Sequence, residues 1–319
     1  SLTKIATAIL VVHLAPDVSQ LVTIDPVDVL DASDGQSMMA LLAGDVISIH
    51  DLLYGLLLNS GNDAATTLAR YLGQQLLDAE GASGDPVQRF MGELNSYLAG
   101  LGLSDTHFVN PHGLYDPDHY STAHDMAIMA GALLENDLLA TIVSTPEITV
   151  TSTLGNAYTL QNTNRLLGEP GITGMKTGTL PESGACLVAS KKGPAGTSIV
   201  TVLLGSEIQF SVEGVQDATT DKRFADAQTI FTSVESDYAW VSPTSDAELP
   251  GLESELAVWQ VAMTDDDPVV VRSSQVSSLR YVLRLGPPVA ANETAGELLL
   301  YDGSSLIESR PVIQIDQTA

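Results

Sequence analysis

The sequence contains few cationic residues and only one cysteine. Its 319 residues include 13 Lys or Arg against 40 Asp or Glu, which gives a formal net charge of −27. Nucleic acid and anionic lipid both need a basic surface, so this balance argues against both kinds of partner. The lone Cys186 excludes an internal disulfide and gives no redox or metal signature. We expect an acidic surface whose self-repulsion salt would screen.

The sequence also lacks a long apolar run and a recognisable signal peptide. No stretch reaches the ~18 apolar residues that a membrane-spanning helix needs. Hydrophobic residues nevertheless make up 44% of the chain, and a chain of this length can bury a sizeable core in two domains. The composition therefore predicts a folded globular protein.

Local patterns predict helices first and an antiparallel sheet after them. Apolar residues recur at helical spacing over 1–14, and further helices are expected over 48–58, 64–77, 85–102, 121–134 and 221–234. Strand patterns are expected over 20–25, 147–153, 157–161, 173–179, 185–191 and 198–205. A helical block combined with such a sheet is an α+β arrangement.

The composition changes at 241–251, where Ser, Pro, Thr and Asp are frequent, as in a linker. Beyond it, short β runs are expected over 269–271, 278–285, 296–301 and 310–315. We therefore predict two domains, an α+β domain over 1–243 and a small all-β domain over 244–319.

Three short motifs carry the candidate chemistry. They are S-x-x-K at Ser1 to Lys4, S-G-N at Ser60 to Asn62, and K-T-G at Lys176 to Gly178. Each motif alone is weak, because such patterns arise by chance in many proteins. Together they use two of only five lysines, and they fall at a helix start, an inter-helix turn and a strand. Their order and residue types match the signature of penicillin-recognising serine enzymes.

The signature gives four of these side chains a role in proton transfer. Ser1 would be the nucleophile, and a free hydroxyl needs a nearby base. Lys4 would be that base, because it shares a helix face with Ser1 and because burial and the Lys176 charge would lower the pKa of its amine. Ser60 and Lys176 would form a proton-relay pair toward the leaving amine.

Other groups of the motifs would hold the substrate. Asn62 would donate its side-chain amide to a substrate backbone carbonyl. The strand carrying Thr177, Gly178 and Thr179 would lie along the substrate, with the glycine allowing close approach. The backbone N–H groups of Ser1 and Thr179 would point at the developing oxyanion.

The chain closely resembles the low-molecular-mass penicillin-binding proteins, which are serine-type D-alanyl-D-alanine carboxypeptidases. The similar blocks span almost the whole chain: SLTKIATA, IHDLLYGLLLNSGNDAA, THFVNPHGLYDPDHYSTAHDMA, NTNRLL, GMKTGTLPESGACLVAS and PPVAANETAGELLLYDGSSLIESRPVI. The resemblance implies a penicillin-binding/β-lactamase-like catalytic domain, with a helical cluster on an antiparallel sheet, followed by a small β-sandwich domain. It also implies that Arg223 lies near the substrate carboxylate.

The resemblance further implies a substrate and a location. Ser1 would attack the penultimate carbonyl of a peptidoglycan stem peptide ending in D-Ala-D-Ala, D-alanine would leave, and water would release the acyl-enzyme. A β-lactam mimics this amide and would acylate the same serine. The enzyme would act outside the cytoplasmic membrane. The family's N-terminal sheet strands and its membrane anchor have no counterpart in this sequence, so membrane association would depend on segments outside it.

Three alternative functions stay open at this stage. A class A β-lactamase typically has Asp in the middle of the second motif and a Glu-x-x-Leu-Asn element; with Leu94 and Asn95 that glutamate would fall at Met91, and Glu93 lies two residues off. A related serine esterase has no feature in its favour. A catalytically impaired cell-wall-binding remnant is the third, because an α-ammonium on Ser1 would perturb Lys4.

The histidines do not indicate a metal site. Four of the six, His107, His112, His119 and His124, lie close together in the sequence. Neither a cysteine nor a compact H-x-x-x-H helix accompanies them. The resemblance implies that they pack behind the site, and we predict neither a metal nor another cofactor.

Overall fold

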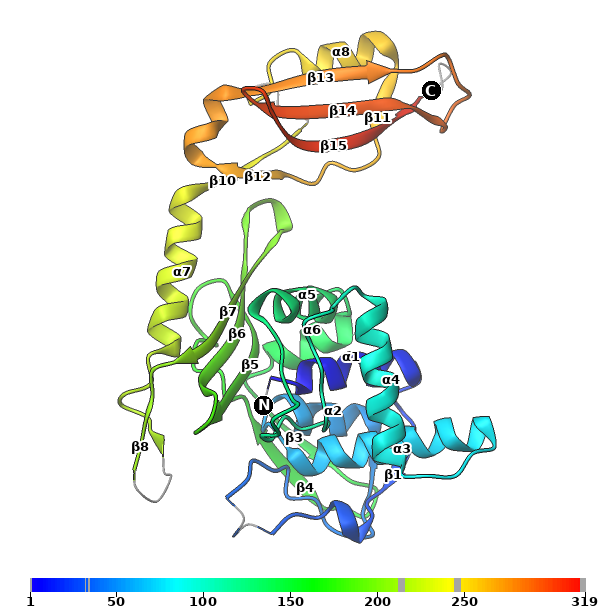
Figure 1. Ribbon diagram of the computed structural model, residues 1–319, viewed down its shortest axis with the longest axis vertical. Coiled ribbons are helices and arrows are strands. Elements are labelled where there is room, and N and C mark those ends of the chain that lie inside the picture. Colours follow the sequence, from blue (N-terminus) through cyan, green and yellow to red (C-terminus); the bar gives the residue numbers. More distant parts are fainter. Residues whose placement is uncertain (1, 32, 34, 212–215, 244–247, 316–319) are drawn as a thin grey trace. The chain divides into compact units, whose positions relative to one another are not determined.

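The computed structural model describes residues 2–31, 33, 35–211, 216–243 and 248–315, and it divides into two compact units (Figure 1). Unit 1 comprises Ser1–Lys192 and Ser198–Thr229, and unit 2 comprises Gly193–Thr197 and Ile230–Ala319. The division falls within helix α7 (Arg223–Asp237). The domain boundary at residue 243 stays a prediction.

Six helices lie wholly within the described part of unit 1, and one of them, α1, is buried at its centre. They are α1 (Lys4–Leu14), α2 (Ile49–Leu57), α3 (Asn62–Glu80), α4 (Pro86–Gly100), α5 (Ala123–Leu134) and α6 (Asp137–Ser144). Helix α1 packs against α2, α3, α4 and α5. No single helix in the described ranges combines the length and the apolar composition needed to cross a membrane.

Helix α1 is buried on all sides. The predicted helix over 1–14 begins at Lys4, and every residue from Lys4 to Val11 is buried. The spacing of its aliphatic residues predicts a single buried stripe, which is wrong. The positions between them are Ala, Thr and Lys, and these are either small or find buried hydrogen-bond partners, so neighbouring helices can pack on every face.

Side-chain caps fix where several of these helices begin. Ser48 Oγ accepts a hydrogen bond from Asp51 N (3.1 Å), and Asp85 Oδ1 accepts one from Val87 N (2.8 Å), as their positions predict. Helix α5 begins at Ala123, two residues after the predicted start at 121, because Thr122 is its cap and accepts from Asp125 N (3.1 Å).

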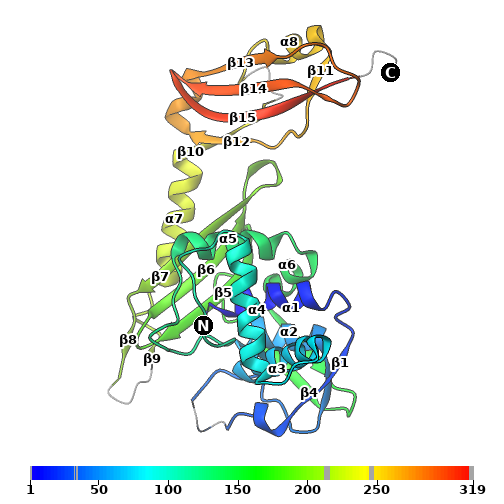
Figure 2. The ribbon, with the colours of Figure 1, turned by 45° about the vertical axis from the view of Figure 1, so that its right-hand side comes forward.

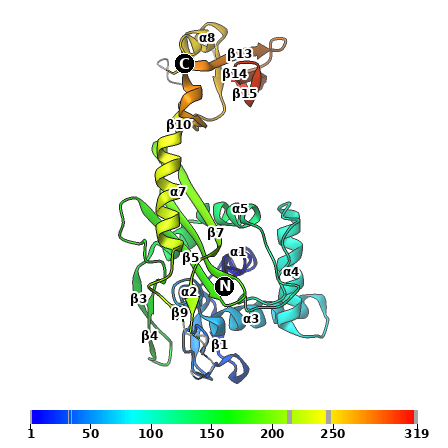
Figure 3. The same cartoon turned by 60° about the vertical axis from the view of Figure 1, so that its left-hand side comes forward.

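A three-stranded antiparallel sheet supports one side of the helical cluster. Its order is β5 (Ile172–Leu180), β6 (Gly184–Lys192) and β7 (Ser198–Ser206). Helices α5 and α6 pack against it, and the first residues of α7 lie on the opposite side of the sheet (Figures 1 and 3). Gly174 has φ +121°, and a Cβ there would lie 2.1 Å from Val143 O, so glycine lets β5 approach α6.

Short strand pairs complete unit 1. They are β1 (Leu21–Thr23) with β2 (Val46–Ser48), β3 (Glu147–Thr151) with β4 (Ala157–Gln161), and β8 (Gln209–Phe210) with β9 (Gln216–Asp217). Short 3-10 helices lie at η1 (Pro26–Asp28) in unit 1 and at η3 (Pro194–Gly196) and η4 (Ser273–Ser278) in unit 2.

Unit 2 contains two antiparallel sheets around its own apolar core. Strand β10 (Tyr238–Val241) pairs with β12 (Val269–Arg272), and a four-stranded sheet has the order β11 (Val261–Met263), β15 (Ser305–Gln314), β14 (Thr294–Asp302), β13 (Leu279–Leu285) (Figures 1 and 2). Residues buried in its core include Leu252, Val271 and Leu298. Helix α8 (Leu252–Trp259) was not predicted for this β-rich part.

Candidate active site

The Lys4 side chain lies fully inside unit 1, at the start of α1. Its Nζ donates hydrogen bonds to Asn62 Oδ1 (2.7 Å) and to the His112 carbonyl (2.7 Å). Burial, and next the positive charge of Lys176, lower the pKa of the Lys4 amine well below its ordinary value of 10.5, while the Asp63 carboxylate opposes this. The amine is therefore biased toward its neutral form.

Ser1, the predicted nucleophile, lies outside the described residues. The chain reaches α1 through a turn at Leu2 and Thr3, in which the Leu2 carbonyl accepts from Ile5 N (3.0 Å). Both residues are buried. The structure thus fixes the backbone between the S-x-x-K serine and its lysine.

The segment over 107–120 holds the first turns of α1 in place. Thr7 Oγ1 donates to Pro111 O (2.7 Å). Val109 N donates to His119 Nδ1 (3.1 Å), so the proton of the neutral ring is on Nε2, which donates to Thr3 Oγ1 (2.7 Å). Burial lowers the pKa of His119 to about 4, so the ring is neutral near pH 7.

His112 also has a structural role, in packing and hydrogen bonding. Its Nδ1 accepts from Leu114 N (3.2 Å), and burial together with the Lys4 charge lowers its pKa to about 3. Within the described residues, no group of three or more His, Cys, Asp or Glu side chains has the arrangement of a metal site.

The S-G-N motif forms the turn between α2 and α3. Ser60 has φ +58°, and at Gly61 a Cβ would lie 2.8 Å from Asp63 Oδ1 and 3.0 Å from Met39 N, which explains the glycine. Asn62 begins α3 and is buried, with its side-chain oxygen on Lys4. The motif therefore brings Asn62 to the S-x-x-K lysine across the core.

Lys176 lies in the middle of β5 and is fully buried. Burial, and next the Arg223 charge, lower the pKa of its amine to about 7. Its Nζ donates to the Thr177 carbonyl (2.9 Å). No hydrogen bond joins Ser60 to Lys176 among the described residues, so the predicted relay pair is not directly connected.

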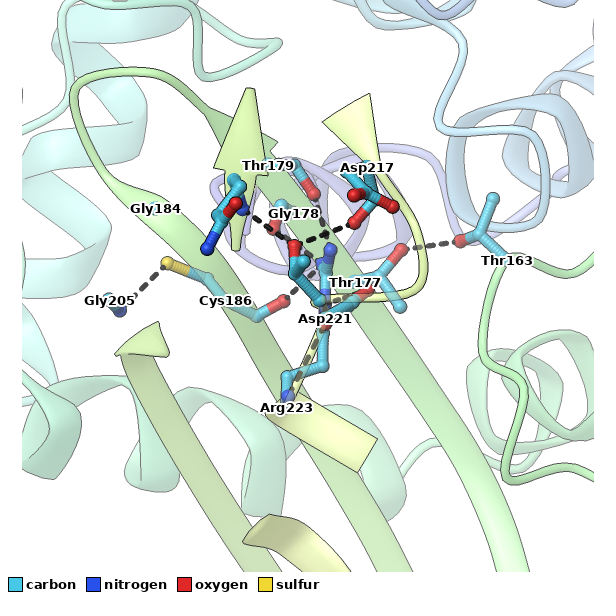
Figure 4. A network of polar contacts seen from close by, with 12 residues as sticks. Thr163, Thr177, Gly178, Thr179, Gly184, Cys186, Gly205, Asp217, Asp221 and Arg223 are labelled. Atoms are coloured by element: carbon cyan, nitrogen blue, oxygen red, sulfur yellow. Dashed lines mark hydrogen bonds and ion pairs between the residues drawn. The ribbon is translucent and has the colours of Figure 1, made fainter. Parts of the chain in front are cut away.

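Arg223 anchors the K-T-G strand from the start of α7 (Figure 4). Its Nη1 donates to the Gly178 and Cys186 carbonyls (2.7 and 3.1 Å), and its Nη2 donates to Thr179 Oγ1 (2.7 Å). Its Nε donates to Asp221 Oδ1 (2.8 Å), in an ion pair whose side chains are both almost completely buried. The guanidinium thus fixes both the strand and the Thr179 hydroxyl.

A pocket of about 400 Å³ opens beside these motifs. Its lining residues include Ser37, Ser60, Thr177, Thr179, Arg165 and Arg223. Thr177 Oγ1 is hydrogen-bonded to Thr163 Oγ1 (2.6 Å) within it. Hydroxyl and guanidinium groups converge on this cavity, and the Asp221 carboxylate, which pairs with Arg223, also lines it. The hydroxyl groups and Arg165 suit a ligand with an anionic group and hydrogen-bonding atoms.

A second, more apolar pocket of about 310 Å³ shares Gly178 with the first. Leu2, Phe108, Tyr115 and Leu204 contribute to its lining. Gly178 of the K-T-G strand therefore lines two cavities, of which one is mainly polar and the other is mainly apolar.

Sequence reasoning missed several residues that shape the site. Gln36 and Ser37 bond to Asn62, Asp63 bonds to the loop before α2, and Asp221 pairs with Arg223. Asp63 and Asp221 stand one and two residues from predicted site residues, so proximity was an available signal. The contact of Gln36 depends on the path of a long loop, for which the sequence carries no local signal.

Comparison with known proteins identifies one family. The family model described as D-alanyl-D-alanine carboxypeptidase matches residues 1–207. The D-alanyl-D-alanine carboxypeptidase DacD of Salmonella typhimurium is 30% identical over 299 residues, which cover 88% of this chain and 68% of DacD. DacF of Bacillus subtilis, a D-alanyl-D-alanine carboxypeptidase, is 35% identical over 195 residues, which cover 60% of this chain and 47% of DacF.

Solved structures agree with these sequence matches. Penicillin binding protein 6B from Escherichia coli aligns with a TM-score of 0.70 and 26% identity, over 98% of this chain and 86% of that one. The Streptomyces K15 DD-transpeptidase aligns with a TM-score of 0.60 and 31% identity, over 73% of this chain and 85% of that one. The predicted α+β penicillin-binding-protein fold is confirmed.

Proposed function

Because the chain belongs to the D-alanyl-D-alanine carboxypeptidase family, we propose that it removes the terminal D-alanine from peptidoglycan stem peptides ending in D-Ala-D-Ala, through an acyl-enzyme on Ser1. It is a serine peptidase of the penicillin-binding type. Ser1 attacks the penultimate carbonyl, D-alanine leaves with a proton, and water hydrolyses the ester. A β-lactam acylates the same oxygen, because its strained amide occupies the place of the scissile bond.

The observation that carries this proposal is the hydrogen bonding of the Lys4 amine. A neutral amine has two N–H groups and one lone pair. Both N–H groups are used, by Asn62 Oδ1 and the His112 carbonyl, each at 2.7 Å. The lone pair is left to accept a proton from the Ser1 hydroxyl, so Lys4 acts as the general base.

Ser60 and Lys176 return a proton to the leaving amine. Lys176, with a pKa of about 7, exchanges protons at neutral pH. Ser60 lines the polar pocket, whereas Lys176 is buried, so the hydroxyl is the member of the pair that contacts the substrate. Proton transfer between the two side chains requires the Lys176 amine to leave the Thr177 carbonyl, to which it donates at 2.9 Å.

The K-T-G strand and Arg223 bind the acidic end of the substrate. Thr177 and Thr179 offer hydroxyl groups, and Arg223 adds a positive charge in a buried setting that strengthens its attraction to a carboxylate. Gly178 lets the peptide lie close to the strand. Asn62 donates its amide to a substrate backbone carbonyl, and the backbone N–H groups of Ser1 and Thr179 stabilise the oxyanion.

The geometry around α4 argues against the β-lactamase alternative. Met91, at the position where a deacylating glutamate would stand, is buried in the core. Asn95 donates to the carbonyls of Phe108 (2.8 Å) and Met91 (3.1 Å) and accepts from Phe108 N–H (2.9 Å). Glu93 pairs with Arg89 (2.9 Å). Slow deacylation of penicillin follows, because no carboxylate is available here to activate water.

The substrate also determines where the enzyme works. Peptidoglycan lies outside the cytoplasmic membrane, so the enzyme acts in the periplasm or at the outer face of that membrane. Residues 1–243 are the catalytic domain, and residues 244–319 are a β-sandwich domain that holds it off the membrane.

Labelling with a fluorescent penicillin tests the proposal. We expect one adduct, mapped by mass spectrometry to the peptide containing Ser1, and we expect Lys4→Met to reduce its rate of formation by about 10²-fold or more. Release of D-alanine from a D-Ala-D-Ala peptide separates carboxypeptidase from β-lactamase activity. An adduct on another residue would contradict the role of Ser1. Absence of any adduct would favour a cell-wall-binding remnant, and rapid penicillin turnover would favour the β-lactamase.

A further inference from the structure

The Asn62 amide lies between Lys4 and Gln36. Its Oδ1 accepts a hydrogen bond from Lys4 Nζ at 2.7 Å. The Nδ2 group therefore points the other way. It donates to Gln36 Oε1 at 2.9 Å. The side chain that is proposed to bind a substrate carbonyl thus already binds a carbonyl of the protein.

Gln36 offers the same chemical group as the substrate. Its side-chain carbonyl is an amide carbonyl, as is a peptide C=O, and it accepts through the same oxygen. Among the described residues, this is its single hydrogen bond. The side chain is half-buried, so it can rotate into solvent and release Asn62.

The backbone next to Gln36 is held much more firmly than its side chain. The Asp63 carboxylate accepts from Met39 N (2.8 Å) and Leu41 N (3.0 Å), and the Asn62 N–H donates to Ser37 O (2.9 Å). Asp63 has no exposed surface. The loop is therefore fixed to the start of α3, and rotation of one side chain can uncover Asn62 without loop movement.

The pocket lining agrees with this arrangement. Ser37 and Ser60, on either side of the contact, line the polar pocket. Asn62 is only 5% exposed and, in the described part of the chain, is not among the lining residues. In the described part of the chain Gln36 is not a lining residue either. It holds one of the two N–H groups of Asn62 Nδ2, and a substrate carbonyl competes with it for that N–H.

We propose that Gln36 is an internal competitor of the substrate: it occupies one N–H of the Asn62 amide in the free enzyme and is displaced when a substrate carbonyl binds to that N–H. The inference rests on the proposed function, because it uses the role given to Asn62. Gln36 thus sets the affinity for ligands that carry such a carbonyl, and it does not alter the acylation step.

The test measures acylation kinetics of Gln36→Ala with two β-lactams. Benzylpenicillin has an exocyclic amide carbonyl, and 6-aminopenicillanic acid has the same lactam without it. For benzylpenicillin we expect the half-saturating concentration to fall about fivefold, as for loss of one competing hydrogen bond, with the limiting acylation rate unchanged. For 6-aminopenicillanic acid we expect no change.

Two further variants sharpen the comparison. Gln36→Glu places a carboxylate on Asn62 Nδ2, which is a stronger acceptor, so the half-saturating concentration of benzylpenicillin should rise. Gln88→Ala, on the exposed surface of α4, is the matched control and should equal the unaltered protein. The melting temperature of each variant is measured to confirm folding.

Opposite results would overturn the inference. If Gln36→Ala weakens benzylpenicillin binding or slows acylation, Gln36 supports Asn62 and does not compete. An equal gain for both β-lactams would show that Gln36 merely narrows the entrance. If the unaltered protein forms no adduct on Ser1, both the proposed function and this inference fail. That outcome can be told apart from failure of the inference alone, because it is seen in the unaltered protein before any variant is compared.

Discussion

At the scale of single residues, the site keeps its lysines and its arginine in different charge states. Arg223, a guanidinium, is paired with the Asp221 carboxylate at 2.8 Å. Among the described residues, the Lys176 amine has a carbonyl as its hydrogen-bond partner and no carboxylate, so burial, and next the Arg223 charge, lower its pKa to about 7. The arrangement costs stability, and it yields an amine that can exchange protons at neutral pH.

The pKa of Lys176 leads to a prediction about stability and pH. The amine has a pKa of about 7 in the folded protein and 10.5 as its ordinary value, so between these values the unfolded chain binds more protons. Stability contributed by this group is present above pH 10.5 and is lost as the pH falls toward 7. Lys176→Met removes the group and should stabilise the protein by about 1–4 kcal/mol near pH 7, with loss of activity.

Thermal unfolding of both proteins from pH 6.5 to 10 provides the measurement. The advantage of the variant in melting temperature should be largest at pH 7 and below, and it should shrink as the pH rises. An advantage that does not vary with pH would mean that packing, rather than the charge, accounts for it. A less stable variant at pH 7 would contradict the unpaired state of the amine.

At the scale of elements, local signals predicted most of unit 1. Caps at Ser48 and Asp85 and the β-branched runs around 173–205 act over a few residues, so the sequence alone was sufficient for α2, α4 and the sheet. Helices α6 and α8 were missed because they are short, with eight residues each. Burial of α1 on all sides was also missed, since it depends on four other helices.

The candidate site shows the same limit. Ser60, Asn62 and Lys176 could be found because their motifs are contiguous in the sequence. The bonds from Asn62 to Lys4 and to Gln36 span 58 and 26 residues, and only the folded chain determines them. The motif residues could therefore be predicted from the sequence, whereas the hydrogen bonds that join them to distant residues could not.

The crossing of α3 and α4 gives a prediction for an element. Gly73 lies on α3, and a Cβ there would be 1.8 Å from the Pro86 carbonyl at the start of α4. Gly73→Ala should therefore destabilise unit 1 by about 1–3 kcal/mol, although alanine favours helix. Gly92→Ala on α4, where nothing lies within 4 Å, should be neutral or stabilise by about 0.5–1 kcal/mol.

Calorimetric unfolding of the two variants distinguishes steric conflict from helix propensity. If propensity dominated, both variants would gain stability. If the helices separate easily, Gly73→Ala would show little loss, and the close approach of α3 to Pro86 would be unimportant for stability.

At the scale of the whole molecule, the dominant property is charge. The net charge of −27 over 319 residues is far larger than pairing can neutralise, since 13 basic residues face 40 acidic ones. Several of the basic side chains are already committed: Lys4, Lys176 and Arg223 to the site, and Arg70 to buried Asp28. Among the described residues, burial removes the two signs equally: Lys4, Lys176, Arg223 and Arg310 are buried, and so are Asp28, Asp45, Asp63 and Asp125. The surface therefore keeps the excess of negative charge.

This excess of surface charge predicts a characteristic dependence on salt. Screening lengths fall to about 10 Å at 0.1 M and about 3 Å at 1 M, so repulsion between neighbouring carboxylates weakens as salt is added. We expect the melting temperature to rise by several degrees between about 0.01 and 0.5 M NaCl, most steeply at the low end, because screening saturates.

The rate of acylation by anionic benzylpenicillin should rise over the same range, since both reactants are negative. Potassium chloride should act equally and sucrose at matched osmolality should not reproduce the early rise, whereas indifference to salt would show that the acidic residues are too far apart to repel.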